Sequence, residues 1–424
     1  MRLTLVGLIP SLAFIVSGCS TPNVVEPPPA PVPTTAPTAP PNIPSGPTFV
    51  YLFSRDGRSD RVQAFRVNPE TGLLEGAGGH SRGAPGRYGT ITADYRGRFL
   101  YMITWRDGFA DTLHAVRIDP ATGALSAGRA ASVPRDVTGV AVHPSGRVAY
   151  LLLDTEDGAF APCRGRGRVY AHDVNPETGA LDPGALQTIA TVNVPRAMVF
   201  HPSGRFAYVA GRGDSTQLYG PCPVGAAAAY AVDPDSGRLT EAPGSPFAVA
   251  HTNEALALTP SGETLYVRQG EQPHDEARSS QWPSIVAYHL DSGTGTPALL
   301  ETRELERRWG VFFRLDPRAR FIYVGAMASD ESTELHVLRV QPSGRLQPAP
   351  GSPVPTGPHP GLVRASLAFE PSGRFAYQIS AEGYAPPRGI DVFAVDPSTG
   401  ALTAVAGSPQ TIPDVGELLM VTVR

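Results

Sequence analysis

The chain has 424 residues, with 45 glycines, 45 prolines and a formal net charge of −4. This composition is typical of many short strands joined by tight turns rather than of helices. The small net charge argues against a nucleic-acid partner. All 35 basic residues are arginines, which excludes Schiff-base chemistry and a P-loop lysine.

The N-terminus has the organisation of an export signal. A short basic start precedes the apolar run LTLVGLIPSLAFIV, which is too short for a comfortable membrane span. The stretch VSGC that follows resembles the lipobox of bacterial lipoproteins, which implies cleavage before Cys19 and lipidation of that residue. Ser20 implies, by the same resemblance, sorting to the outer membrane. The alternative is an ordinary secretory signal.

Proline dominates the segment from Thr21 to Pro47, which lacks the apolar periodicity of a core. Such a composition favours polyproline II, at about 3.1 Å per residue. We therefore expect three parts: a signal peptide over 1–18, a lipidated cysteine with a disordered linker over 19–47, and a folded body over 48–424.

Two motifs alternate through the folded body. One recurs six times and joins two apolar runs through a Pro/Gly turn, as in VFHPSGRFAYVA at 199–210. The other recurs seven times and centres on turns such as NPETG. Each motif predicts a strand, a turn and a second strand. Together they give four strands per unit, at a period typical of propeller blades.

The first unit begins at its second strand, TFVYLF, and the chain ends with an unpaired apolar run over Leu418 to Val423. If that run supplies the missing innermost strand, an all-β, seven-bladed propeller closes without a long open edge. The predicted blades run near 48–80, 86–133, 135–192, 194–250, 251–305, 308–357 and 361–413.

The repeats resemble the propeller-fold lactonase family, which includes 6-phosphogluconolactonases and carboxymuconate cyclases. HPSGRFAYV at 201–209 and the NPETG turns carry the resemblance, which covers nearly everything after Thr48. It implies a propeller fold and, in active members, His, Arg and Glu around the central mouth. One scaffold of this kind hosts several functions, so the resemblance is more specific for fold than for activity.

Three stretches depart from the site pattern of that family. The family's GPRH corresponds here to VPRA, in which Arg196 keeps the arginine and Ala197 replaces the histidine. Its NEL-x-ST corresponds to GRGDST, in which Arg212 replaces the acid. Its PHAH-type histidines correspond to PRDVTG, which contains Arg135 and Thr138. A methyl group cannot move a proton, and a guanidinium is no general base.

Three hypotheses follow. The favoured one is a lipid-anchored, non-catalytic propeller of the cell envelope, at the outer membrane, which binds a small anionic ligand or an envelope protein. The alternative is an exported lactonase acting on a sugar-type lactone with a rearranged site, in which Glu254 is a candidate base. A third is a structural partner of an outer-membrane assembly. The candidate binding residues are Arg87, Arg135, Arg196, Glu254, Arg308 and Arg364.

No cofactor and no metal site is expected. We interpret His143 and His201, which lie in turns, as structural. His274, Asp275 and Glu276 lack the spacing of a metal site and fit a solvated loop better.

The two remaining cysteines occupy similar places in consecutive repeats. Cys163 lies 20 residues after His143, and Cys222 lies 21 residues after His201. Exported proteins meet oxidising conditions, in which such a pair tends to be bridged. We therefore predict a Cys163–Cys222 disulfide.

Overall fold

The structure is a computed structural model that describes residues 46–424 except 54–60, 83–86, 106–110, 127, 155–166, 193, 212–225, 249–252, 270–283, 306–308, 328–332, 358–366, 381–388, 413–414 and 416. All described residues belong to one compact unit, 40–424. Within them, no helix is long and apolar enough to cross a membrane. Cys19 and the proline-rich linker lie outside this part of the chain.

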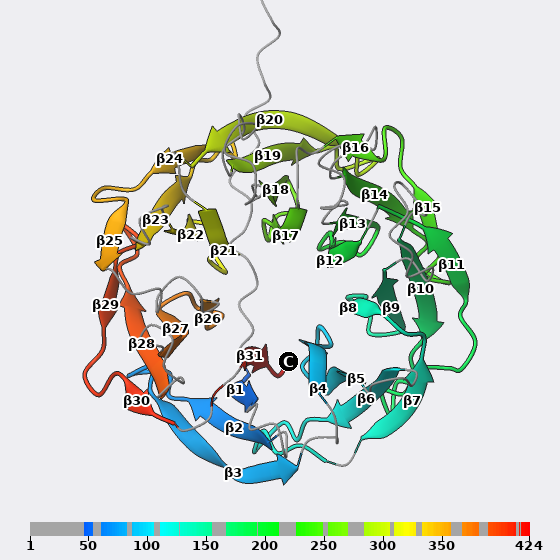
Figure 1. Ribbon diagram of the computed structural model, residues 1–424, viewed down its shortest axis with the longest axis horizontal. Coiled ribbons are helices and arrows are strands. Elements are labelled where there is room, and N and C mark those ends of the chain that lie inside the picture. Colours follow the sequence, from blue (N-terminus) through cyan, green and yellow to red (C-terminus); the bar gives the residue numbers. More distant parts are fainter. Residues whose placement is uncertain are drawn as a thin grey trace, which may run out of the picture. The chain divides into compact units, whose positions relative to one another are not determined.

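Seven antiparallel sheets form a ring around a central axis (Figure 1). We number these blades along the chain and give their strands from the axis outward. Blade 1 contains β31 (Glu417–Thr422), β1 (Thr48–Phe53), β2 (Arg61–Val67) and β3 (Leu74–Arg82). Blade 2 contains β4 (Arg87–Ala93), β5 (Phe99–Trp105), β6 (Asp111–Arg117) and β7 (Arg129–Val133). Blade 3 contains β8 (Val137–Val142), β9 (Val148–Leu153), β10 (Arg168–Asp173) and β11 (Gln187–Ala190).

The remaining blades follow the same order. Blade 4 contains β12 (Pro195–Phe200), β13 (Phe206–Gly211), β14 (Ala226–Val232), β15 (Leu239–Glu241) and β16 (Phe247–Ala248). Blade 5 contains β17 (Asn253–Leu258), β18 (Thr264–Gln269), β19 (Ser284–Leu290) and β20 (Pro297–Glu304). Blade 6 contains β21 (Trp309–Leu315), β22 (Phe321–Met327), β23 (Thr333–Val340), β24 (Leu346–Pro348) and β25 (Val354–Gly357). Blade 7 contains β26 (Ala368–Phe369), β27 (Phe375–Ser380), β28 (Gly389–Val395), β29 (Leu402–Ala404) and β30 (Gln410–Thr411).

The predicted seven-bladed closure is confirmed. Strand β31 pairs with β1 along its whole length, from Thr48 opposite Thr422 to Phe53 opposite Glu417. Val421 and Val423 of this C-terminal segment are buried against blade 1 and blade 2 side chains. The last strand of the chain therefore completes the first blade.

The outer strand differs from the prediction in blades 4, 6 and 7, where it is split in two. A Ser-Pro step interrupts it at Pro246, Pro353 and Pro409. Proline has no N–H and cannot donate to the ladder. The preceding serine compensates in each blade: Ser245 Oγ, for example, accepts the N–H of Ala229 at 3.0 Å.

A buried tyrosine on the second strand joins six of the seven blades to the next. Tyr208, for example, donates its hydroxyl to the carbonyl of Gly295, in the turn between the two outer strands of blade 5, at 2.9 Å. A Cβ on Gly295, whose φ is 71°, would lie 2.4 Å from the ring of Phe206, so this turn requires glycine. The same bond is made by Tyr51, Tyr150, Tyr266, Tyr323 and Tyr377.

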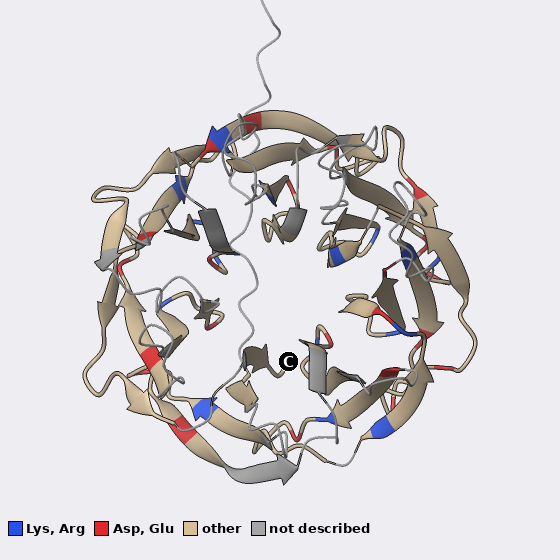
Figure 2. Cartoon of the chain, viewed as in Figure 1, with Lys and Arg blue, Asp and Glu red and all other residues tan. Residues whose placement is uncertain are grey.

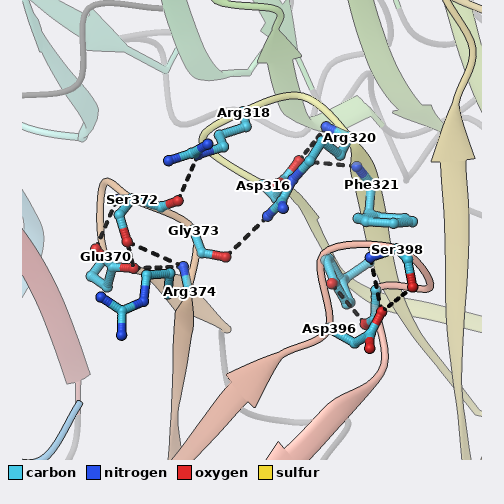
Figure 3. A network of polar contacts seen from close by, with 12 residues as sticks. Asp316, Arg318, Arg320, Phe321, Glu370, Ser372, Gly373, Arg374, Asp396 and Ser398 are labelled. Atoms are coloured by element: carbon cyan, nitrogen blue, oxygen red, sulfur yellow. Dashed lines mark hydrogen bonds and ion pairs between the residues drawn. The ribbon is translucent and has the colours of Figure 1, made fainter. Parts of the chain in front are cut away.

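The turns after the innermost strands contact one another around one face. Asp316 accepts the N–H groups of Arg320 and Phe321, and pairs with the Arg320 guanidinium at 2.9 Å (Figure 3). Arg320 also donates to the carbonyl of Gly373, in the equivalent turn of blade 7, at 3.0 Å. We call this face the turn face. The opposite end, where the innermost strands begin, is the start face.

Candidate functional site

The innermost strands bring four predicted site residues to the start face. Arg87 begins β4, Arg135 lies two residues before β8, and Arg196 and Glu254 are the second residues of β12 and β17. Every innermost strand runs toward the turn face, so these residues meet at one mouth of the ring. The side chains of Arg87 and Glu254 are not described. The remaining predicted residues lie outside the described ranges: Arg212, Arg308, Arg364, Cys163 and Cys222.

A β-bulge recurs near the start of these strands. In β12 the register moves from Pro195 opposite Gly211 to Ala197 opposite Ala210, which leaves Arg196 as the extra residue. The same shift leaves Thr138 unpaired in β8 and Glu254 unpaired in β17. A bulge bends its strand and re-aims the side chain at the extra position, and such features are frequent beside active sites. The sequence analysis did not predict these β-bulges.

Hydrogen bonds connect the bulges of consecutive blades. Thr90 of β4 donates through Oγ1 to the carbonyl of Thr138 at 3.3 Å. Thr138 in turn donates through Oγ1 to the carbonyl of Pro195, directly before Arg196. The residue that replaces the family histidine in blade 3 therefore links three blades at the start face.

Three charged residues at this mouth have described side chains open to solvent. Arg196 is exposed in β12, and its neighbour Ala197 is partly buried. Arg135 and Asp136 are exposed in the connection into blade 3. Asp136 has a φ of 63°, a left-handed conformation that few residues other than glycine, asparagine and aspartate tolerate. Guanidinium and carboxylate groups thus occupy neighbouring blades, an arrangement suited to an anionic transition state.

A buried carboxylate that sequence reasoning missed lies behind this connection. Asp111, the first residue of β6, is 5% exposed, and its Oδ2 accepts the N–H of Val137 at 3.4 Å. Burial raises the pKa of Asp111, while hydrogen bonds from Val137 and Asp136 oppose that rise. Asp111 belongs to blade 2, so its contact with blade 3 could not be read from one repeat.

Two arginines add positive charge between blades 5 and 6. Arg268, on β18, is 7% exposed, whereas Arg314, on β21, remains accessible to solvent. Partial loss of hydration lowers the pKa of the Arg314 guanidinium, and the positive charge of Arg268 lowers it further. The arginine directly after the apolar run LYV is a sequence signal that could have identified this position.

The central cavity opens toward the other end of the ring. It measures about 910 Å³ and is lined by the last residues of the innermost strands and their turns, including Phe200, Leu258 and Phe369. At its rim the guanidinium carbon of Arg424 lies 4.1 Å from the ring centroid of Tyr95. Among the predicted site residues with described side chains, Arg135, Thr138, Arg196 and Ala197 do not line this cavity. Its lining includes the carboxylate of Asp94, but that group pairs with Arg98 at 3.1 Å and accepts the N–H of Phe99, so it holds the turn together.

The turn histidines have structural partners, as interpreted from the sequence. His143 contacts Ser145 Oγ through Nδ1 and the Gly204 carbonyl of the next blade through Nε2, both at 2.8 Å. Burial lowers the pKa of His143 and that of His201. Within the described ranges, no group of three or more His, Cys, Asp and Glu residues could hold a metal ion. The cluster His274, Asp275 and Glu276 lies outside them.

Charged residues of both signs are distributed around the ring rather than gathered on one blade (Figure 2). The candidate site is therefore defined by the few residues at the bulges, and not by a charged surface that covers a whole blade.

Comparison with known proteins identifies the family. The family model described as "Lactonase, 7-bladed beta-propeller" matches residues 42–365. The chain belongs to this lactonase family. The resemblance noted in the repeats is thereby confirmed, together with the fold that it implied.

Curated relatives and solved structures agree with this membership. Two 6-phosphogluconolactonases, from Pectobacterium atrosepticum and Pectobacterium carotovorum, are 25% and 24% identical, and each match covers 70% of this chain and 80% of the relative. The structure of the periplasmic gluconolactonase PpgL of Pseudomonas aeruginosa aligns with a TM-score of 0.64 at 17% identity, over 89% of this chain and 100% of that one. The structural likeness shows the fold. Family membership favours the lactonase alternative over the non-catalytic module that the substitutions at Ala197 and Thr138 had suggested.

Proposed function

We propose that this propeller hydrolyses a lactone at its start face, with Arg196 stabilising the oxyanion and Glu254 acting as general base. The observation that carries the proposal is the pair of equivalent bulges in β12 and β17, which single out one arginine and one glutamate on neighbouring innermost strands. Opposite charges at corresponding positions of adjacent blades provide the two groups that ester hydrolysis requires.

The chemistry assigns a distinct task to each group. Water attacks the lactone carbonyl carbon and gives one proton to the Glu254 carboxylate as the new C–O bond forms. The carbonyl oxygen becomes anionic, and the Arg196 guanidinium stabilises that charge. Collapse of the intermediate breaks the ring C–O bond, and the proton passes to the departing alkoxide. The product is a hydroxy acid, and no cofactor takes part in these steps.

The family histidine is absent, so the base must come from a different blade. Ala197 occupies that position and pairs with Ala210 in the sheet. Glu254 lies one blade further along, on a strand in contact with β12. We therefore propose a rearranged site rather than the family's own arrangement.

Export limits the substrate. We propose that Cys19 anchors the protein in the envelope, which separates it from phosphorylated sugar lactones, since these are mainly cytosolic. An unphosphorylated sugar-type lactone fits such a location better. The arginines Arg135 and Arg196 would then contact the developing oxyanion and the product carboxylate rather than a phosphate.

A second function is supported by a different observation. Thr138 and Ala197 both replace histidines of the family pattern, and Thr138 serves the structure by bonding the Pro195 carbonyl. A propeller that has lost catalysis and keeps its exposed arginines would bind an anionic ligand or an envelope protein through the same face.

Lactone turnover by the full-length protein distinguishes the two functions. Acid release from a panel of γ- and δ-sugar lactones would be followed in a pH-stat, with the spontaneous rate subtracted. We expect Arg196→Met to lower kcat about 100-fold, because a transition-state donor is lost. Glu254→Gln should lower it by a similar factor, because no base remains.

Matched controls lie on the turn face of the same blades. Arg205→Met and Glu263→Gln remove the same charges from exposed turn positions and should leave kcat unchanged. A wild-type rate equal to the spontaneous rate for every lactone would exclude hydrolysis and leave the binding function.

A further inference from the structure

Asp111 fixes the backbone that enters blade 3. Its carboxylate accepts N–H groups from Asp136 and Val137, so one buried side chain of blade 2 holds both residues. From the other side, the N–H of Asp154 donates to the carbonyl of Asp136 at 3.1 Å. The left-handed Asp136 is therefore clamped between two blades, which offsets the cost of its strained conformation.

The backbone that Asp111 holds continues directly into the bulges of β8 and β12. Val137 is the residue before Thr138, whose hydroxyl donates to the carbonyl of Pro195. The next residue after Pro195 is Arg196. A continuous path of covalent and hydrogen bonds thus runs from Asp111 in blade 2, through blade 3, to the exposed guanidinium in blade 4.

The buried position of Asp111 opposes the ionisation of its carboxyl group. Asp111 is 5% exposed, and the charged groups that face it are Arg135, which favours its ionised form, and Asp136, which disfavours it. Burial is the largest influence and raises the pKa of Asp111, so folding disfavours the ionised form. A group of this kind stabilises the fold only at low pH, and that contribution is lost as the pH rises through its folded pKa.

We propose that Asp111 is a positioning residue, which holds the start of β8 and, through Thr138, the bulge that presents Arg196. The role in catalysis rests on the proposed lactone hydrolysis. Asp111 does not touch the reacting atoms. It orders the backbone beneath a group that does, and small displacements of such a group lower turnover strongly.

The test compares Asp111→Ala, Asp111→Asn and Asp316→Ala in the full-length protein. Asp316 is an equally buried carboxylate that holds backbone N–H groups on the turn face, far from the bulges along their strands. We expect Asp111→Ala to lower kcat about tenfold, with KM changed by less than about threefold. Asp111→Asn keeps one acceptor oxygen and should restore part of kcat. Asp316→Ala should lower the melting temperature, because it leaves Arg320 without its partner, and should leave kcat unchanged.

Hydrogen exchange provides a readout that does not depend on turnover. Peptides covering 134–138 and 194–197 should exchange faster in Asp111→Ala than in the wild type, and should be unchanged in Asp316→Ala. Unchanged exchange in these peptides would overturn the clamp, even if no lactone is turned over and the proposed function fails. Faster exchange with an unchanged kcat would overturn the positioning role while leaving the proposed function intact.

Discussion

At the scale of single residues, the propeller depends on side chains that leave their own blade. Six of the seven tyrosines at the equivalent position of the second strand donate to a glycine carbonyl of the following blade. The seventh, Tyr101, is fully buried, and its hydroxyl has no partner within the described residues. The same tyrosine position therefore occurs with a hydrogen-bonded hydroxyl in six blades and, within the described part of the chain, without one in blade 2. Blade 2 serves as a control for the energy of this hydrogen bond.

Removing these hydroxyls should have opposite consequences. Tyr208→Phe leaves the buried Gly295 carbonyl without its donor, and should cost about 1–2 kcal/mol of unfolding free energy. Tyr101→Phe removes a buried hydroxyl that lacks a partner, and should be neutral or stabilising by up to about 1 kcal/mol. Urea denaturation of both variants measures the difference. Equal destabilisation by the two substitutions would show that Tyr101 also has a bonding partner.

The sequence predicted which residues start the innermost strands, but not how they are presented. Arg135, Arg196 and Glu254 could be found because each stands beside a recognisable apolar run. A bulge depends on the register between two strands, and no single repeat encodes it. Asp111 was missed for a related reason, because its partner Val137 lies 26 residues away, in another blade.

At the scale of elements, turn chemistry made the fold predictable. The NPETG-type turns mark strand ends in all seven blades and the Pro/Gly turns in six, and their spacing gave both the blade number and the closure. The outer strands were predicted less well, because a Ser-Pro step splits three of them without changing the apolar pattern. The closing strand β31 is the element on which the whole ring depends.

Deleting residues 417–424 should disrupt far more than a chain end. The deletion removes the partner of β1 from Thr48 to Phe53 and exposes that strand as an apolar edge. It also removes Val421 and Val423 from the packing between blades 1 and 2. We expect aggregation or loss of the cooperative melting transition. The matched control deletes Arg424 alone, which retains every pair between β1 and β31, and an identical melting curve for both proteins would argue against closure by β31.

At the scale of the whole molecule, the sequence predicts an export signal and a proline-rich linker ahead of the propeller. The propeller is the part that the structure describes, and its family membership is shown by a match over residues 42–365. The lipid anchor and the Cys163–Cys222 bridge remain predictions from the sequence. The anchor bears on the proposed function, because location would decide which lactones reach the start face.

Fractionation of cells that express the protein tests the anchor directly. We expect the wild type to sediment with membranes, because the several acyl chains of a bacterial lipoprotein bind far more firmly than one chain does. Cys19→Ala removes the lipidated residue and should release the protein from membranes or leave its signal uncleaved. Ser20→Ala is the matched control, since it alters the neighbouring residue and keeps the thiol. If Cys19→Ala sediments and migrates like both the wild type and this control, the protein is held at the membrane by other means. The proposed exclusion of phosphorylated sugar lactones, which depends on the lipid anchor, would then be unsupported.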